Sequence, residues 1–292
     1  MPDFDVACGD HRLAVTYSPA GGAAVVALHG ASNGTRDFFL YEHLHRVLPP
    51  AGIGVATFDR RGEGDSTGEP SRGQFALQVE DALAVANSLD VEHVGLWGYS
   101  QGGWVAPLAA AQSERIDFLI LIASTGVTPA EQMMYATAEQ LRRAGHSPKT
   151  VERALALRQA FDDWAHGRVT DGGTALEHEL IATADEPWRP LAFLPPRLPD
   201  EPGRRRWVEE MDFDPTHSFE QVNIPTLLFY GADDAWTPID SSIDAWRTAG
   251  GDDVEIMTIP NSSHSLTLPD GTLAPQYERK IVDWISTVCP TH

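Results

Sequence analysis

Residues 93–111, with the sequence HVGLWGYSQGGWVAPLAAA, decide the fold. The stretch opens with an apolar, strand-like run at 94–97, turns through Gly98-Tyr99-Ser100-Gln101-Gly102 and continues in an Ala-rich run of helical character. A strand, a tight turn and a helix form the setting in which the pattern G-x-S-x-G marks a nucleophilic serine. Side chains on either side of so strained a turn would collide, so both flanking positions must be glycine. The stretch therefore predicts that Ser100 is lifted clear of a sheet, at a helix N-terminus that favours a developing negative charge.

The same pentapeptide can also arise by chance in a chain that contains 25 glycines. The strand before it and the helix after it favour the nucleophile, but a serine needs partners. The interpretation therefore depends on whether a base, an acid and a second oxyanion donor occur elsewhere in the chain.

The length and apolar content indicate a globular protein with an ample core. The chain has 292 residues, of which 42 % are hydrophobic, and no apolar run approaches the length needed to cross a bilayer. Residues 1–5, MPDFD, lack the basic and then apolar pattern of a signal peptide. We expect a soluble, cytoplasmic protein.

The formal net charge of −21 limits the classes of partner. Such a surface repels nucleic acid and anionic membranes, so neither is expected as a partner. The expected partner is a small-molecule, ester-type substrate, as argued below, and the oligomeric state is left open. The two cysteines, Cys8 and Cys289, lie at opposite ends of the chain and suit a reducing compartment. We find no Cys/His spacing typical of zinc, and neither a metal nor an organic cofactor is predicted.

Apolar runs of strand length alternate with segments of helical periodicity. The runs lie at 23–28, 52–58, 94–97, 118–123, 226–230 and 254–259, and residues 4–17 are typical of an edge hairpin. Helical patterns cover 36–48, 72–89, 238–249 and 274–288. This alternation predicts an α/β protein with a doubly wound, mostly parallel sheet.

The alternation stops between two late strands. Residues 126–216 contain no convincing strand, and 129–144 and 150–166 have helical patterns. A structureless loop of this length would be unusual in a compact domain. We therefore predict a core formed by 1–125 and 217–292, with 126–216 inserted as a mainly helical cap or lid.

The residues with catalytic chemistry follow the predicted strands. Ligands bind at the carboxyl ends of strands in such sheets, and His264 follows the last strand. Imidazole is the natural base for a serine because its pKa lies near neutrality. An acid that orients it would come from the turn after 226–230, where Asp233 and Asp234 both remain candidates.

The order Ser100, Asp234, His264 resembles that of the α/β-hydrolase family. The resemblance covers the chain outside the cap and rests on Leu28-His29-Gly30, residues 59–66 (DRRGEGDS), the elbow at 98–102 and residues 231–234 (GADD). It implies that the acid lies three residues after Gly231, which selects Asp234. It also implies an oxyanion hole formed by the backbone N–H groups of Ala31 and Gln101.

The resemblance implies further roles around the site. His29 and residues 59–61 would brace the surrounding loops, and no metal or cofactor would be needed. The cap would set specificity through aromatic side chains. Trp164 and Trp188, together with Tyr99 of the elbow, are candidate substrate-binding residues, with simple packing of the cap as the alternative.

The combined reading is a serine hydrolase that cleaves a small or medium carboxylic ester through an acyl-enzyme, with lactones and thioesters as related substrates. An aminopeptidase or amidase on the same triad is an alternative, for which cap acids such as Glu177 and Glu209 could bind an ammonium group. A hydrolase-fold protein that binds a small molecule with little turnover is a second alternative.

Overall fold

The computed structural model describes residues 3–289 except 33 and 252. By their internal contacts the residues form two compact units. The first, here called the core unit, comprises Met1–Gly126, Pro215–Asp234 and Ile239–His292. The second, here called the inserted unit, comprises Val127–Asp214 and the short segment Ala235–Pro238, which lies within the predicted core range 217–292.

The core unit contains an eight-stranded sheet in the order β1-β2-β4-β3-β5-β6-β7-β8. The first two strands form an antiparallel edge hairpin, β2 pairs antiparallel with β4, and all other neighbours are parallel. This confirms the predicted doubly wound, mostly parallel α/β fold. The strands are β1 Asp3–Cys8, β2 His11–Ser18, β3 Ala23–Leu28, β4 Ile53–Phe58, β5 His93–Tyr99, β6 Ile116–Ile122, β7 Thr226–Gly231 and β8 Val254–Ile259.

Burial explains why the central strands have unbroken apolar sequences. Every residue of β3, β4 and β7 is buried, as expected of parallel strands that helices cover on both faces. In the edge strand β8 only Ile259 is buried, and the sequence of β8 is more polar than those of the central strands.

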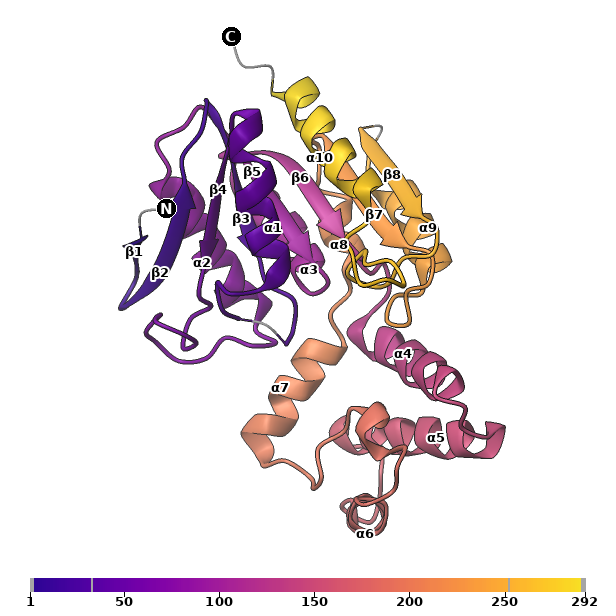
Figure 1. The fold of residues 1–292 in the computed structure, drawn as a ribbon. Helices are drawn as coiled ribbons and strands as arrows, with labels where there is room; N and C mark the ends of the chain where they lie inside the picture. Colours follow the sequence, from indigo (N-terminus) through magenta and orange to yellow (C-terminus); the bar gives the residue numbers. More distant parts are fainter. Residues whose placement is uncertain (1–2, 33, 252, 290–292) are drawn as a thin grey trace. The chain divides into compact units, whose positions relative to one another are not determined.

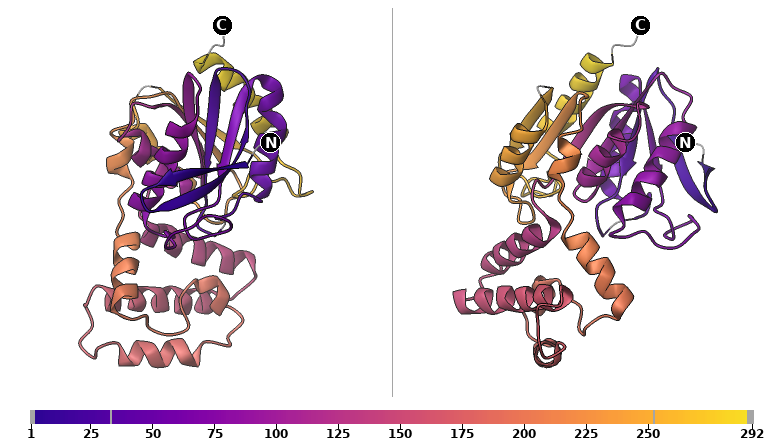
Figure 2. Two further views of the ribbon diagram at one scale, coloured as in Figure 1. Left: turned by 90° about the vertical axis from the view of Figure 1, so that its left-hand side faces the viewer. Right: turned by 180° about the vertical axis from the view of Figure 1, so that it is seen from behind.

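Helices cover both faces of the sheet (Figures 1 and 2). Helices α1 and α10 pack their apolar sides on one face, with Tyr41 and Tyr277 among the fully buried side chains. Helices α2, α3, α8 and α9 lie on the other face. The bounds are α1 Phe39–Val47, the 3-10 helix η1 Pro49–Ala51, α2 Phe75–Ser88, α3 Gly102–Ala110, α8 Thr216–Phe219, α9 Ile239–Ala249 and α10 Pro275–Val288.

The inserted unit is helical in the part that the structure describes. Its helices are α4 Pro129–Arg143, α5 Pro148–Ala165, α6 Thr174–Ala182, the 3-10 helix η2 Arg189–Ala192 and α7 Glu201–Met211. The side chains of Thr128, Ser147 and Asp200 cap α4, α5 and α7, and each of these helices has proline in its first turn. Leu141, Phe161 and other apolar residues form a separate hydrophobic cluster within this unit.

Helices α6 and α7 were not predicted. Helix α6 follows the Gly172-Gly173 pair and has a weak helical pattern, with Leu176 and Leu180 as its buried residues. Helix α7 buries only Met211 and carries three consecutive arginines. In both helices the apolar stripe is too narrow for periodicity to reveal it. No helix among the described residues is long and apolar enough to cross a membrane.

Candidate active site

Ser100 occupies a strained turn between β5 and α3. Its φ angle is 52°, in the left-handed region that residues other than glycine rarely adopt. The backbone N–H of Ser100 donates to the Ile122 carbonyl at the end of β6 (2.9 Å), and the Ser100 carbonyl accepts from the N–H of Gly103 (2.8 Å). The turn is therefore held on both sides by hydrogen bonds that do not use the Ser100 hydroxyl.

Close backbone packing requires the two glycines that flank the elbow. A Cβ atom on Gly98 would lie 2.3 Å from the Gly102 carbonyl oxygen. A Cβ atom on Gly102 would lie 2.9 Å from the Leu28 carbonyl oxygen, in the neighbouring strand β3. Both approaches are shorter than van der Waals contact, which is the physical reason for the G-x-S-x-G pattern here.

His264 and Asp234 are brought together by two adjacent strand ends. Gly231, at the end of β7, pairs with Ile259, at the end of β8, so the segments that follow leave the sheet side by side. The Nδ1 atom of His264 lies 2.7 Å from Oδ2 of Asp234. Because an ionised carboxylate only accepts hydrogen bonds, Nδ1 carries the hydrogen and Nε2 is left as the basic nitrogen.

The two aspartates of the turn differ in position. The Asp234 side chain is fully buried and contacts His264, whereas Asp233 is exposed. The backbone N–H of Asp233 donates to the Ser262 carbonyl (2.9 Å) and ties the two segments together. Of the two candidates that the turn offers, Asp234 has the geometry of an acid that orients His264.

Tyr99 connects the elbow with the histidine segment. Its ring centroid lies 5.3 Å from that of His264, with the two planes inclined by 57°. Burial, and to a smaller extent the charge of Asp234, raise the pKa of the Tyr99 hydroxyl, so this side chain stays neutral at ordinary pH. The residue that precedes Ser100 thus packs against the ring of the predicted base.

The backbone N–H groups of Ala31 and Gln101 lie in corresponding positions of neighbouring loops. Leu28 pairs with Gly98 in the parallel ladder of β3 and β5, and Ala31 and Gln101 each follow this pair by three residues. Among the described residues, neither N–H group has a hydrogen-bond partner. Two unpaired donors beside the elbow are what an oxyanion hole requires.

Arg60 fixes the direction of one of these donors. Its guanidinium Nη2 donates to the Gly30 carbonyl (2.5 Å), and its backbone N–H donates to the Gly34 carbonyl (2.6 Å). In a planar trans peptide the carbonyl and the N–H point in opposite directions. By holding the Gly30 carbonyl, the buried Arg60 side chain therefore turns the N–H of Ala31 away from itself.

A model of the α/β-hydrolase family matches residues 25–274. The chain belongs to the α/β-hydrolase family. It also resembles a 2-hydroxy-6-oxononadienedioate/2-hydroxy-6-oxononatrienedioate hydrolase of Paraburkholderia xenovorans, with 24 % identity over 95 % of this chain and 92 % of that protein. Lysophosphatidylserine lipase ABHD12 of Mus musculus is 45 % identical over 87 residues, which are 29 % of this chain and 21 % of the lipase.

Other similarities are either short or remote. An uncharacterized 31.7 kDa protein of Escherichia coli, from the traX-finO intergenic region, is 41 % identical over 76 residues, 24 % of this chain, and the match covers 27 % of that protein. Among solved structures, proline iminopeptidase of Mycobacterium smegmatis has a TM-score of 0.65 at 18 % identity, covering 98 % of each chain. An esterase of Exiguobacterium antarcticum has a TM-score of 0.63 at 16 % identity, covering 98 % of this chain and all of the esterase. These two establish the fold alone.

His29 of this α/β-hydrolase is buried as a neutral imidazole. Its Nε2 atom donates to the Phe58 carbonyl (2.6 Å), and its ring packs edge-on against the rings of Tyr41 and Phe58. Burial, reinforced by the positive charge of Arg60, lowers the pKa of His29 to about 3. These contacts agree with the bracing role that the family resemblance implied.

This burial predicts an acid-dependent loss of stability. His29 titrates near pH 6.5 in the unfolded chain and near 3 in the folded one, so the unfolded state binds the extra proton between these values. Stability is therefore lost as pH falls through this window, by about 3 kcal/mol at pH 4 for this one group. Urea unfolding from pH 7 to pH 4 should show a shallower acid dependence for His29→Gln than for the wild type. Identical dependences would contradict the assignment, whatever the absolute stability of the variant.

The two tryptophans proposed as substrate-binding residues lie inside the inserted unit. Trp164 and Trp188 are buried in its hydrophobic cluster, with 9 % and 3 % of their surfaces exposed. The guanidinium groups of Arg204 and Arg153 stack on their respective rings. These contacts favour the packing alternative for both.

One grouping of potential metal ligands has no counterpart among the residues predicted from the sequence. The ligand atoms of Cys8, His11 and Asp81 lie within 4.8 Å of one another. Asp81 already accepts from His11 Nε2 (3.0 Å) and from Arg61 Nη2 (2.7 Å), and burial raises the pKa of the Cys8 thiol to about 11. A cation would have to displace the Arg61 guanidinium. Asp81 lies 70 positions after His11, so sequence spacing gave no signal.

Proposed function

We propose that the protein is a serine hydrolase that cleaves a small or medium carboxylic ester, with Ser100 as nucleophile, His264 as base and Asp234 as the orienting acid. The observation that carries the proposal is the 2.7 Å contact between His264 Nδ1 and the buried carboxylate of Asp234. It engages Nδ1, so that Nε2 is the ring nitrogen available to take a proton, in the same unit as a serine held at a φ of 52°.

In the acylation step, the Ser100 hydroxyl attacks the ester carbonyl carbon while His264 Nε2 takes its proton. The negative charge that develops on the carbonyl oxygen would be stabilised by the N–H groups of Ala31 and Gln101, each worth about 3 kcal/mol in such sites. The tetrahedral intermediate then collapses. Its C–O bond to the alcohol breaks, and the imidazolium returns the proton to the leaving oxygen.

In the deacylation step, water attacks the acyl-enzyme. His264 takes a proton from the water and transfers it to the oxygen of Ser100 as the acyl bond breaks. Asp234 keeps its charge throughout and stabilises the imidazolium of His264. The acid product and the free serine are thereby restored, and no redox step or co-reactant other than water is involved.

One relative, matched over 21 % of its length, supports an ester as the substrate class. A lysophosphatidylserine lipase shares a segment of 87 residues at 45 % identity. For an aminopeptidase, a free carboxylate would be needed to bind the substrate amine. In the inserted unit, a further acid, Glu179, is occupied by the guanidinium of Arg153 (2.9 Å). Glu177 is half-buried on helix α6 and has no ion pair among the described residues. Glu209 is exposed on helix α7.

A comparison of esters with an amide tests the proposal. We expect the wild type to hydrolyse p-nitrophenyl esters from acetate to decanoate with a maximum at one chain length, and an alanine p-nitroanilide at least about a hundredfold more slowly. Turnover of the anilide without preference for esters would support the aminopeptidase instead. Tight binding of an ester without release of p-nitrophenol would support the binding protein with little turnover.

A further inference from the structure

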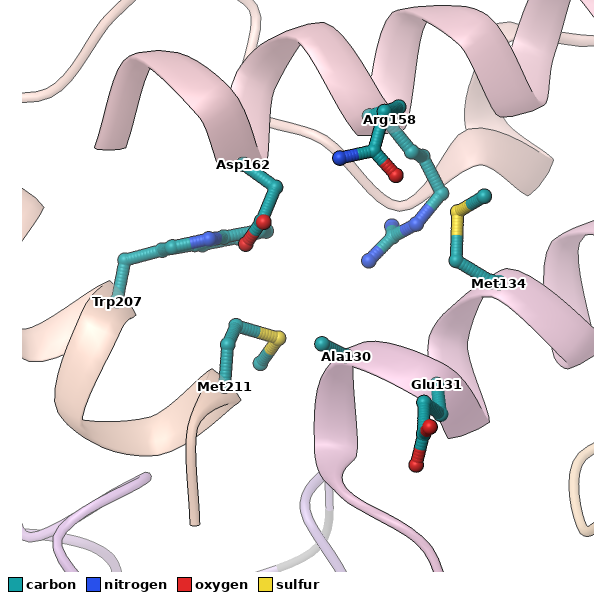
Figure 3. Close-up of a pocket in the computed structure, with 8 residues that line it drawn as sticks. Ala130, Glu131, Met134, Arg158, Asp162, Trp207 and Met211 are labelled. Carbon is teal, nitrogen blue, oxygen red and sulfur yellow. The ribbon is translucent and has the colours of Figure 1, made fainter. Parts of the chain in front are cut away.

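A cavity of about 280 Å³ lies within the inserted unit, between helices α4, α5 and α7. Met134, Trp207 and Met211 give it apolar walls. Figure 3 shows the guanidinium of Arg158 extending into this space between Met134 and Trp207. All residues that line the cavity belong to the inserted unit, so the site is defined without reference to the core unit.

Arg158 is the polar group that makes this cavity unusual. The residue is 4 % exposed, and its Nη1 atom donates to the carbonyl oxygens of Ala192 (2.6 Å) and Phe193 (3.4 Å). Its Nε atom is buried and has no hydrogen-bond partner among the described residues. In that same part of the chain, no carboxylate forms an ion pair with Arg158. Although burial lowers the pKa of Arg158 to about 10, the side chain remains charged at neutral pH.

Two acidic residues, Glu131 and Asp162, also line the cavity, and each has other partners. Asp162 is ion-paired with Arg168 (2.5 Å) and approaches His166 Nδ1 (3.4 Å). Glu131 accepts from the backbone and hydroxyl of Thr128, as part of the capping box of α4. The charge of Asp162, one turn away on α5, acts on Arg158 and raises its pKa, but among the described residues no carboxylate oxygen lies within ion-pair distance of the guanidinium. A buried charge without an ion pair costs several kcal/mol.

A second unpaired donor borders the same cavity. The indole Nε1 of Trp207 is buried and has no partner among the described residues. Its ring lies 6.0 Å from the guanidinium carbon of Arg158. Buried donors are normally satisfied, so two unsatisfied donors at one cavity, which is lined by both apolar and polar side chains, point to an acceptor that the unit itself does not supply.

We propose that this cavity binds a small carboxylate with an apolar tail, the carboxylate lying against Arg158 and the tail between Met134 and Met211. The N–H groups of a guanidinium match the two oxygens of a carboxylate, and the guanidinium of Arg158 extends into the cavity. Flexible methionine side chains adapt to tails of different shape. The proposal concerns the inserted unit alone and does not depend on the esterase assignment.

Octanoate and its neutral isostere octanamide test the proposal. Calorimetric titration into the Ser100→Ala protein, which excludes turnover, should show octanoate binding at least tenfold more tightly than octanamide. Arg158→Met should abolish this preference, because methionine keeps the apolar volume but removes the charge. Arg153→Met is the matched control: Arg153 is a half-exposed arginine of the same helix, stacked on Trp188, and its loss should leave the preference unchanged.

Two further variants keep the test decisive if Arg158→Met does not fold. Trp207→Phe removes the indole N–H and keeps an aromatic ring, and should weaken octanoate binding severalfold. Met134→Trp fills the cavity with Arg158 in place, and should abolish the binding of both ligands. Equal affinities for octanoate and octanamide in the Ser100→Ala protein would overturn the proposal. A preference that survives in Met134→Trp, or in a folded Arg158→Met protein, would also overturn it.

Discussion

Replacing Ser100 with alanine is expected to lower kcat/KM for p-nitrophenyl esters by about 10⁴-fold or more, because the acyl-enzyme can no longer form. The residual rate would come from substrate binding and the oxyanion donors, which the substitution leaves in place. Alanine and serine have similar freedom at a φ of 52°, and the backbone hydrogen bonds of the elbow do not use the hydroxyl. The melting temperature should therefore change little.

Ser286→Ala is the matched control for this prediction. Ser286 is exposed on helix α10, and its hydroxyl donates to the Val282 carbonyl of the same helix (2.9 Å). Its loss removes one hydroxyl of the same kind without touching the elbow, so the rate should stay within about twofold of the wild type. Ester turnover by Ser100→Ala at the rate of this control would exclude Ser100 as nucleophile.

Asp234→Asn should lower kcat by about 10⁴-fold with a small change in KM, as when the acid of a Ser-His-Asp triad is made neutral. The amide can donate a hydrogen bond to His264 Nδ1 at the present 2.7 Å, and this would place the ring hydrogen on Nε2. His264 in that tautomer cannot take the proton of Ser100. The stabilising charge beside the imidazolium is lost as well.

Asp233→Asn provides a control at the adjacent residue. It makes the same chemical change one position earlier, on a side chain that is exposed and does not make the 2.7 Å contact with His264 Nδ1. We expect its kcat to stay within about twofold of the wild type. Kinetic measurements on both variants with one ester decide between the two aspartates, and a larger loss in Asp233→Asn would reverse the assignment.

Much of the core unit could be predicted because its signals are local. The alternation of apolar runs with helical segments predicted a mostly parallel sheet, and the pentapeptide at 98–102 predicted the strained turn at Ser100. Each signal depends on residues close together in sequence. The edge hairpin of β1 and β2 was likewise predicted from the pattern of residues 4–17. Helices α1, α2, α9 and α10 of the core unit begin and end within a few residues of the ranges predicted from the sequence.

The inserted unit was less predictable because its helices depend on packing with one another. Helices α6 and α7 bury few residues each, and their sequences lack a broad apolar stripe. The aromatic residues of this unit indicated a substrate pocket or a hydrophobic core, and burial favours the core for Trp164 and Trp188. The burial of Arg158 without an ion pair could not be predicted from the sequence, because it depends on which side chains pack around the guanidinium.

The sequence by itself determined the strand-turn-helix at Ser100, the order of serine, aspartate and histidine, and the alternation that builds a mostly parallel sheet. Only the tertiary structure placed Asp234 in contact with His264, brought Cys8, His11 and Asp81 together, and left Arg158 buried without an ion pair. The physical reason is that propensity and periodicity act over a few residues. Which side chains meet across strand ends and between helices depends on long-range packing.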